Sequence, residues 1–469
     1  MKNSMPDITL TYKRRKTDSV QIGNVAIGGN HPICVQTMAN VSTNDINGSL
    51  EQLQRVCEAG AQMVRFTTQG TKEVESLKII HDQWQQSNPQ AVPLVADVHF
   101  QADVADKAAQ VVEKVRINPG NYIDPARKFK QINYTQAEYE QELQQLADRF
   151  NRLLDICEQH QTALRIGVNH GSLSDRIMSR YGNSVEGMVE SCMEFLRVAK
   201  KRHFANIVVS LKASNTRLMV DSVRKMVQQM EQENMFYPIH LGVTEAGEGE
   251  DGRIKSAVGI GALLAEGIGD TVRMSLSEPP ENEIESAQCL IDYFVKGDSV
   301  RYTSVQCSQE NGVVKYKSQE KCDWQTFQIH AAADCGWLLW KYEANDLQII
   351  NDHFEPTKLE QLSKDILQAS RIRMYKTEYI SCPGCGRTLF DLPTVIAQVK
   401  EATAQYKGLK IAIMGCIVNG PGEMADADYG YVGAGRDRIS LYKGKECVLK
   451  NIPQEDAVKE LISLIEKDK

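Results

Sequence analysis

The chain has 469 residues and a net charge of −7, with 54 lysines and arginines against 61 aspartates and glutamates. This length suggests about two to four domains, and the composition is ordinary for a globular protein. The negative charge does not favour nucleic acid or an anionic membrane as a partner. No segment approaches the ~20 apolar residues of a membrane span. The N-terminus lacks the apolar core of a secretion signal, so we expect a cytoplasmic protein with reduced thiols.

Short apolar runs typical of buried strands recur along the first 280 residues, each followed by a stretch with helical spacing of apolar residues. The alternation predicts a parallel sheet with covering helices. Eight such units predict a (β/α)₈ barrel, and a doubly wound sheet is the alternative. The expected strands are residues 33–38, 63–68, 92–98, 114–118, 163–168, 206–211, 238–243 and 271–276.

Polar residues follow these predicted strands where each strand ends. In a (β/α)₈ barrel these positions surround the active site. Four arginines and a lysine would then share one mouth, which suits a phosphate ligand such as a small diphosphate. The residues are Arg65, Asp97 with His99, Arg116, Arg165 with Asn169, Lys212, Thr244 with Glu245, and Arg273 with Ser275.

Glu245 is an acid in this otherwise basic set, within the glycine-rich segment TEAGEGEDGR. It is either a residue of a solvated acidic loop or a general acid beside developing negative charge. Asp97 and His99 are weaker candidates for the same work. The glycines of GIGALLAEGIGD lack the order of a dinucleotide-binding motif, so helix packing is the preferred explanation.

Two segments interrupt the pattern of strands and helices. Residues 121–160 contain a polar, helix-like insertion that we expect on the surface. Residues 297–370 are mixed in pattern, and Trp337 and Trp340 in this segment are typical core residues.

The twelve cysteines are mostly isolated, but Cys382 and Cys385 form a Cys-x-x-Cys pair in ISCPGCGRTLFDL. Such a pair lets two thiolates bind one metal ion or cluster. Cys416 opens the loop CIVNGPGEM, which also contains Glu423, and Cys447 follows further on. Zinc held by the four cysteines is one reading. An iron–sulfur cluster held by Cys382, Cys385 and Cys416, with Glu423 on the fourth iron, is the better supported one.

The chain resembles the 4-hydroxy-3-methylbut-2-enyl diphosphate synthases of the methylerythritol phosphate route to isoprenoids. The motifs that carry the resemblance include VQTMAN, MVRFTTQG, LRIGVNHGSL, GVTEAG, YISCPGCGRTLFDL and MGCIVNGPGE. It implies a [4Fe–4S] cluster held by Cys382, Cys385, Cys416 and Glu423, and Glu245 as the catalytic acid or base. It also implies substrate binding by Arg65, Arg116, Arg165, Asn169, Lys212 and Ser275.

The resemblance further implies a TIM barrel at residues 1–296 and an α+β cluster domain at 371–469, similar to those of sulfite and nitrite reductases. Residues 297–370 would be a short α/β remnant of the central domain of longer members, which leaves the placement of the two main domains open. The implied substrate is 2-C-methyl-D-erythritol 2,4-cyclodiphosphate, reduced by two electrons from ferredoxin or flavodoxin. A homodimer is expected.

Two other functions remain open at this stage. One is a barrel enzyme with a phosphate or pterin substrate and a structural zinc site. The other is an electron carrier or cluster-transfer protein, which would leave the basic mouth and Glu245 without a purpose.

Overall fold

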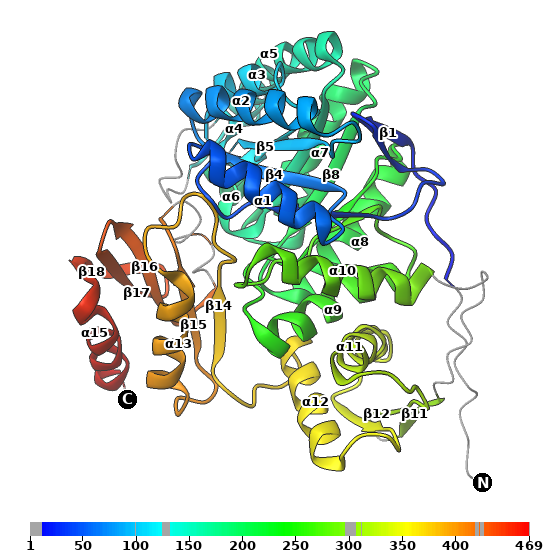
Figure 1. Cartoon of the computed structure of the whole chain (residues 1–469), viewed down its shortest axis with the longest axis vertical. Helices are drawn as coiled ribbons and strands as arrows, with labels where there is room; N and C mark the ends of the chain where they lie inside the picture. The colour runs from blue at the N-terminus through cyan, green and yellow to red at the C-terminus, as the bar shows by residue number, and fades with distance from the viewer. Residues whose placement is uncertain are drawn as a thin grey trace.

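The computed structural model describes residues 12–98, 100–123, 132–295, 306–310, 312–417, 422 and 426–468. Two residues singled out above, His99 and Glu423, lie outside this set. Figure 1 shows the barrel above two smaller units, the central segment and the C-terminal sheet. Among the described helices, none is both long enough and apolar enough to cross a membrane.

Eight parallel strands form the barrel, in the order β8-β7-β6-β5-β4-β3-β10-β9. A bridge between Val209 and Ile239 joins the two end strands of this order. The (β/α)₈ prediction is therefore confirmed, and the doubly wound alternative is wrong. The strands are β3 (Cys34–Met38), β4 (Met63–Thr68), β5 (Leu94–Val98), β6 (Lys114–Ile117), β7 (Ala163–Asn169), β8 (Ile207–Lys212), β9 (His240–Leu241) and β10 (Thr271–Val272).

Helices surround these strands and pack apolar stripes against them. The long helices are α1 (Ile46–Glu58), α2 (Thr71–Ser87), α5 (Gln136–His160), α7 (Val185–Lys201), α8 (Thr216–Gln232), α9 (Gly249–Ala265) and α10 (Pro280–Val295). Shorter turns are α3 (Ala102–Ala108), α4 (Pro119–Tyr122), η1 (His170–Ser172) and α6 (Asp175–Tyr181). The polar insertion is helix α5, as predicted. Thr135 and Glu138 cap its start reciprocally, and Leu146, Phe150 and Leu153 form its buried stripe.

A hairpin that the sequence analysis did not anticipate closes the end of the barrel where the strands begin. Its strands β1 (Ser19–Ile22) and β2 (Val25–Gly28) are antiparallel. Val20, Ile22 and Ile27 are fully buried against residues at the starts of the barrel strands, including Cys34 and Met63. With this end plugged by apolar side chains, the opposite end is the open one.

The central segment is a small α/β layer packed on the barrel. Its strands β11 (Gln306–Glu310), β12 (Val313–Lys317) and β13 (Asp346–Ile350) form one sheet, with helices α11 (Trp324–Lys341) and α12 (Pro356–Ala369). A side chain at Gly261 of α9 would collide with Ala333 of α11, so the two helices are in close contact. Gly261 belongs to the segment GIGALLAEGIGD, whose glycines serve packing, as expected. Trp337 and Trp340 of α11 are buried.

The C-terminal domain is a five-stranded mixed sheet in the order β14-β15-β16-β17-β18. The first three strands are parallel, and the last two are antiparallel to their neighbours. The strands are β14 (Glu378–Ser381), β15 (Lys410–Met414), β16 (Tyr429–Gly435), β17 (Arg438–Lys443) and β18 (Glu446–Pro453), and the helices are α13 (Leu392–Thr403) and α15 (Gln454–Lys467). The carboxyl ends of β14 and β15 lie at one edge, which positions the loops that follow them together.

Gly261→Ala is expected to lower the melting temperature. Alanine favours a helix interior over glycine by about 1 kcal/mol, so helix propensity alone would raise stability. Here the added methyl group would force α9 and α11 apart, at a cost of about 1–3 kcal/mol. Calorimetry would measure the shift. Gly435→Ala is the control, because the nearest atom to its new Cβ, that of Arg438, is 3.7 Å away. A higher melting temperature for Gly261→Ala would contradict the tight packing.

Candidate active site

A cavity of about 90 Å³ lies between the open end of the barrel and the C-terminal domain of the same chain. Its barrel wall consists of Met38, Arg65, Asp97, Arg116, Arg165, Asn169, Ser210, Lys212, Thr244, Glu245, Arg273 and Ser275. Its other wall consists of Cys382, Pro383, Gly384, Cys385, Arg387, Met414, Gly415 and Cys416. The structure thus brings together the predicted site residues except His99 and Glu423, which lie outside the described residues.

Strand register explains why the basic residues meet. Arg116 on β6 pairs with Arg165 on β7, and Asn169 at the end of β7 pairs with Lys212 at the end of β8. Arg116 and Arg165 therefore lie level with each other, and Asn169 and Lys212 form a second level nearer the strand ends. Arg65, Arg165 and Lys212 are each at most 8% exposed, so water solvates their charges poorly.

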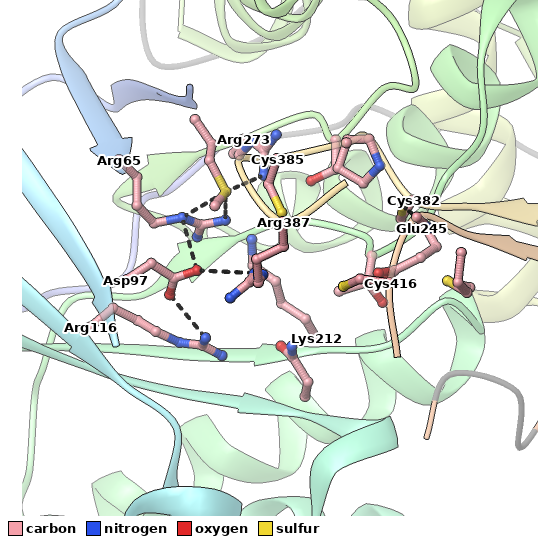
Figure 2. A pocket seen from close by; sticks show the side chains of 18 of the residues that line it. Arg65, Asp97, Arg116, Lys212, Glu245, Arg273, Cys382, Cys385, Arg387 and Cys416 are labelled. Carbon is pink, nitrogen blue, oxygen red and sulfur yellow. Dashed lines mark hydrogen bonds and ion pairs between the residues drawn. The ribbon is translucent and has the colours of Figure 1, made fainter. Parts of the chain in front are cut away.

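Acidic partners neutralise part of this charge. Asp97 accepts a hydrogen bond from Arg116 at 3.0 Å, lies 3.8 Å from Nε of Arg65 and 4.0 Å from Nη2 of Arg387. Glu283 of α10 binds Arg273 through both oxygens, at 2.8 and 3.2 Å. Asp97 is thus committed to arginines, which argues against its use as an acid or base. Figure 2 shows it between Arg65, Arg116 and Arg387.

The remaining positive charge is under-compensated. Nε and Nη1 of Arg165 have no hydrogen-bond partner among the described residues. Burial, together with the neighbouring arginines, lowers the pKa values of Arg165 and Lys212 well below their usual range. A bound anion would accept hydrogen bonds from the unpaired donors and would also neutralise the buried positive charge. Guanidinium groups bind phosphate oxygens in pairs. The mouth is therefore built to hold an anion.

Glu245 stands beside this basic group with a strained backbone. It follows β9 with φ of +48°, a left-handed conformation that is unusual for glutamate. The side chain is 6% exposed, and its Oε2 has no hydrogen-bond partner among the residues described. Burial raises the pKa of Glu245, although Lys255 and Lys212 oppose the shift. A carboxyl group that keeps its proton near neutral pH is suited to act as a general acid.

The three cysteines lie on two adjacent loops of the C-terminal domain. Cys382 and Cys385 follow β14 and are separated by Pro383 and Gly384, the latter with φ of +76°. Cys416 follows β15, the parallel neighbour of β14. The backbone N–H of Gly415 donates to Sγ of Cys382 at 3.2 Å. Burial, together with the other two thiols, raises the pKa of Cys382 to about 12, so an unliganded thiolate is disfavoured there.

Cys447 is remote from this group. It lies on β18, four strands from β14 in the sheet, which is roughly 19 Å at about 4.8 Å per strand. Its thiol donates instead to the carbonyl of Leu449, at 3.7 Å. The alternative of a zinc ion held by four cysteines is therefore wrong, because the fold keeps Cys447 away from the cavity.

The donor set of the cavity fits an iron–sulfur cluster. Within the described part of the chain, no three His, Cys, Asp or Glu side chains converge closely enough to hold a single metal ion. A multi-iron cluster does not require the ligands to converge on one point, because each thiolate binds a different iron. Gly422, next to Glu423, packs its backbone against Gly171 of η1 so closely that a side chain there would collide with it. Gly422 thus contacts the rim of the barrel mouth.

The sequence analysis gave no role to two residues of the cavity wall, Met38 and Arg387. Met38 ends β3, and its sulfur accepts hydrogen bonds from Arg65 at 3.2 and 2.8 Å. Arg387 ends the CPGCGR motif, in which only the two cysteines were assigned a function from the sequence. The position of Arg387, two residues after a cysteine with ligand spacing, was the sequence feature that could have indicated its place in the site.

Anion binding at the mouth is expected to take up protons. Lys212 loses its proton readily in the empty cavity, because burial lowers its pKa. A bound anion raises that pKa again, so protons are taken up at pH values between the lowered pKa and the raised one. Calorimetry with sulfate, which has no titratable proton near neutral pH, in buffers of different ionisation enthalpy would measure the uptake. Lys212→Met should reduce it, and equal uptake in both proteins would contradict the assignment.

Comparison with known proteins gives a consistent result. A model described as the GcpE TIM-barrel domain matches residues 17–288, and one described as the GcpE protein C-terminal domain matches residues 378–467. The chain is 43% identical to the 4-hydroxy-3-methylbut-2-en-1-yl diphosphate synthase (flavodoxin) of Parabacteroides distasonis, over 97% of this chain and 98% of the relative. It is 44% identical to the Bacteroides fragilis protein of the same name, over 97% and 96% of the two chains.

A more distant relative of the same name, from Leptospira interrogans, is 35% identical over 97% of this chain and 96% of its own length. The alignment with the Parabacteroides protein spans 602 positions, which exceeds the 469 residues of this chain. That relative therefore carries segments that this chain lacks. Because the family models and these relatives cover the barrel and the cysteine-bearing domain together, the chain belongs to the GcpE family.

Proposed function

We propose that this chain catalyses the reaction for which its relatives are named, the formation of 4-hydroxy-3-methylbut-2-en-1-yl diphosphate. It is an oxidoreductase of isoprenoid precursor biosynthesis. The observation that carries the proposal is the single cavity in which a cationic barrel mouth faces three cysteines. An electron carrier would need the cysteines but not the buried cations, and a barrel enzyme without redox chemistry would not need the cysteines.

The domain assignment that fits this function is a substrate barrel at residues 1–296, a central segment at 297–370 and a cluster domain at 371–469. In this structure the cluster domain lies over the barrel of its own chain, and both walls of the cavity come from one chain. A homodimer stays our prediction, but the described site does not need a partner subunit to bring its two walls together.

The substrate that suits the mouth is 2-C-methyl-D-erythritol 2,4-cyclodiphosphate. Its diphosphate would meet the buried guanidinium and ammonium groups, and the neutral donors would orient the remaining oxygens. Neutralising the diphosphate also makes the phosphate oxygen on C2 a better leaving group. The residues proposed for substrate binding are Arg65, Arg116, Arg165, Asn169, Lys212 and Ser275.

The cofactor we propose is a [4Fe–4S] cluster held by Cys382, Cys385 and Cys416, with Glu423 as the fourth ligand. When bound, such a cluster supplies electrons one at a time at the cavity wall opposite the diphosphate. The N–H of Gly415 would continue to donate to Sγ of Cys382, which stabilises the thiolate form of this ligand.

Glu245 is the proposed proton donor. In the net reaction the C2–O bond to phosphate breaks, the C3 hydroxyl leaves as water and a C2=C3 double bond forms. Two electrons and one proton balance this change when the product carries one more negative charge than the substrate. Because burial raises the pKa of Glu245, the carboxyl group holds the proton that the leaving hydroxyl requires.

The electrons would come from reduced flavodoxin, which the names of the relatives give, or from ferredoxin. Cys385 lines the cavity and also an outer groove together with Phe390 and Pro393. This groove is where a redox protein can come nearest to the proposed cluster. We place the reaction in the cytoplasm, where thiols stay reduced.

Cysteine substitutions test the proposed cofactor. Cys416→Ser is expected to reduce the iron and sulfide content of anaerobically purified protein well below about four atoms of each, because a cluster thiolate is lost. Cys447→Ser is the matched control and should retain the full content, since Cys447 lies at the far edge of the sheet. Iron loss in Cys447→Ser, or zinc in the wild type, would contradict the ligand set.

Glu245→Gln tests the proposed acid. Turnover should fall by roughly 10²–10⁴-fold while substrate binding is retained, since the amide keeps the shape of the side chain but cannot donate the proton. In the wild type, activity should decline as the pH rises through the raised pKa of Glu245. Steady-state rates with a reduced one-electron donor would measure both effects. An unchanged alkaline limb in Glu245→Gln would assign that limb to another group.

A further inference from the structure

Arg387 is the one cation that the C-terminal domain contributes to the described cavity wall. It lies in the loop after β14, two residues beyond Cys385. Figure 2 shows its guanidinium group inside the cavity, between Cys385 and the barrel residues Asp97 and Lys212. The barrel cations come from the strand ends, so Arg387 approaches the same space from the opposite side.

The hydrogen bonds of this guanidinium group are incomplete. Arg387 is 9% exposed, and its Nε and Nη1 have no hydrogen-bond partner among the described residues. On the barrel side, Nη2 lies 4.0 Å from Oδ2 of Asp97, which is long for an ion pair, and on the C-terminal side the Cys385 thiol interacts with the guanidinium group. Buried donors without partners are costly, so these nitrogens require an acceptor that the described residues do not supply.

Asp97 cannot meet this requirement alone. One of its oxygens accepts from Arg116 at 3.0 Å, and the other lies 3.8 Å from Nε of Arg65. A third arginine therefore shares a carboxylate that is already engaged. The other acids of the cavity region are no better placed, because Glu283 is bound by Arg273 and burial favours the protonated form of Glu245. Among the described residues the Cys385 thiol is the other candidate, but it is a proposed cluster ligand, so an anion from outside the chain is the acceptor that we assign to Nε and Nη1.

The loop backbone sets the direction of Arg387. Gly386 sits so close to the loop between β3 and α1 that a Cβ there would lie 2.9 Å from the carbonyl oxygen of Val41 and 3.1 Å from Cα of Ser42. A bulkier residue would lift the C-terminal loop from the barrel. The guanidinium group therefore reaches the barrel mouth only while this loop is seated.

We propose that Arg387 binds the diphosphate of the substrate from the C-terminal side and thereby couples anion binding to the seating of this domain over the barrel. The identity of the anion rests on the proposed function. The bound diphosphate would complete the hydrogen bonds of Nε and Nη1 and would hold the Arg387 loop against the mouth.

A purely structural role would have a different signature. If Arg387 only tied the two domains together through Asp97, its loss would loosen the domain contact with or without an anion. A substrate-binding role predicts that the effect appears mainly when the anion is present.

Kinetics of the holoenzyme give the first test. Arg387→Met is expected to raise KM for the cyclic diphosphate roughly tenfold or more, because charge-assisted hydrogen bonds to phosphate are lost. Arg387→Lys should raise it less, because lysine binds phosphate as a point charge. Arg438→Met removes a positive charge from an exposed position of the same domain and should leave KM within about twofold. Iron content is measured for every variant, and if Arg387→Met loses iron, Arg387→Lys carries the test.

Hydrogen exchange with inorganic pyrophosphate gives the second test, which needs no turnover. In the wild-type holoenzyme, pyrophosphate should slow amide exchange both at the barrel mouth and in residues 383–388. In Arg387→Met it should still protect the mouth but no longer protect that loop. Equal loop protection in both proteins, or an unchanged KM in iron-replete variants, would overturn the inference.

The two proposals fail differently. If wild-type holoenzyme does not convert the cyclic diphosphate, the proposed function is wrong. If the wild type converts it and the Arg387 variants behave like Arg438→Met, only the role of Arg387 is wrong.

Discussion

The excess of buried positive charge at the barrel mouth is the constraint on which the rest of the site depends. The ends of four parallel strands bring cations into one cavity, and Asp97 and Glu283 neutralise only part of their charge. Such a group is stable only if an anion completes it or if some members lose charge, and the lowered pKa of Lys212 is the second response. A bound diphosphate would be the anion that completes the group. Stability of the closed site and affinity for the substrate therefore have the same electrostatic origin.

The C-terminal domain is held at this mouth mainly by polar contacts. Lys255 of α9 binds Glu378 at 3.0 Å, Lys400 of α13 binds Glu248 at 2.8 Å, and Lys376 binds Asp251 at 2.6 Å. The α9–α11 contact, in contrast, is apolar and tight. The partly exposed pairs Lys400–Glu248 and Lys376–Asp251 can exchange with water, whereas interlocked helices do not separate readily. The central segment is thus expected to move with the barrel, while the C-terminal domain is the part that can separate to admit substrate.

The two walls of the cavity divide the chemistry between them. The barrel wall supplies cations and a carboxyl group whose pKa is raised by burial, and the other wall supplies thiols that favour a soft metal centre. Glu245 stands near the boundary, where its left-handed backbone directs a buried side chain into the cavity. Glu245 and the thiols face one cavity, so the proton for the leaving hydroxyl and the electrons would reach the substrate in the same space.

The sequence by itself determined the barrel, because buried strands and amphipathic helices have distinct periods, and it also identified Arg65, Arg116, Arg165, Lys212 and Glu245 as strand-end residues. The Cys-x-x-Cys spacing likewise marked a metal site. Only the tertiary structure decided that Cys447 is excluded, that Asp97 serves arginines and that Arg387 enters the barrel mouth. Each of these depends on contacts between residues distant in the chain, which strand order and domain placement set and which local pattern does not encode. The hairpin that closes the barrel and the position of the C-terminal domain over the barrel of its own chain also depend on such contacts.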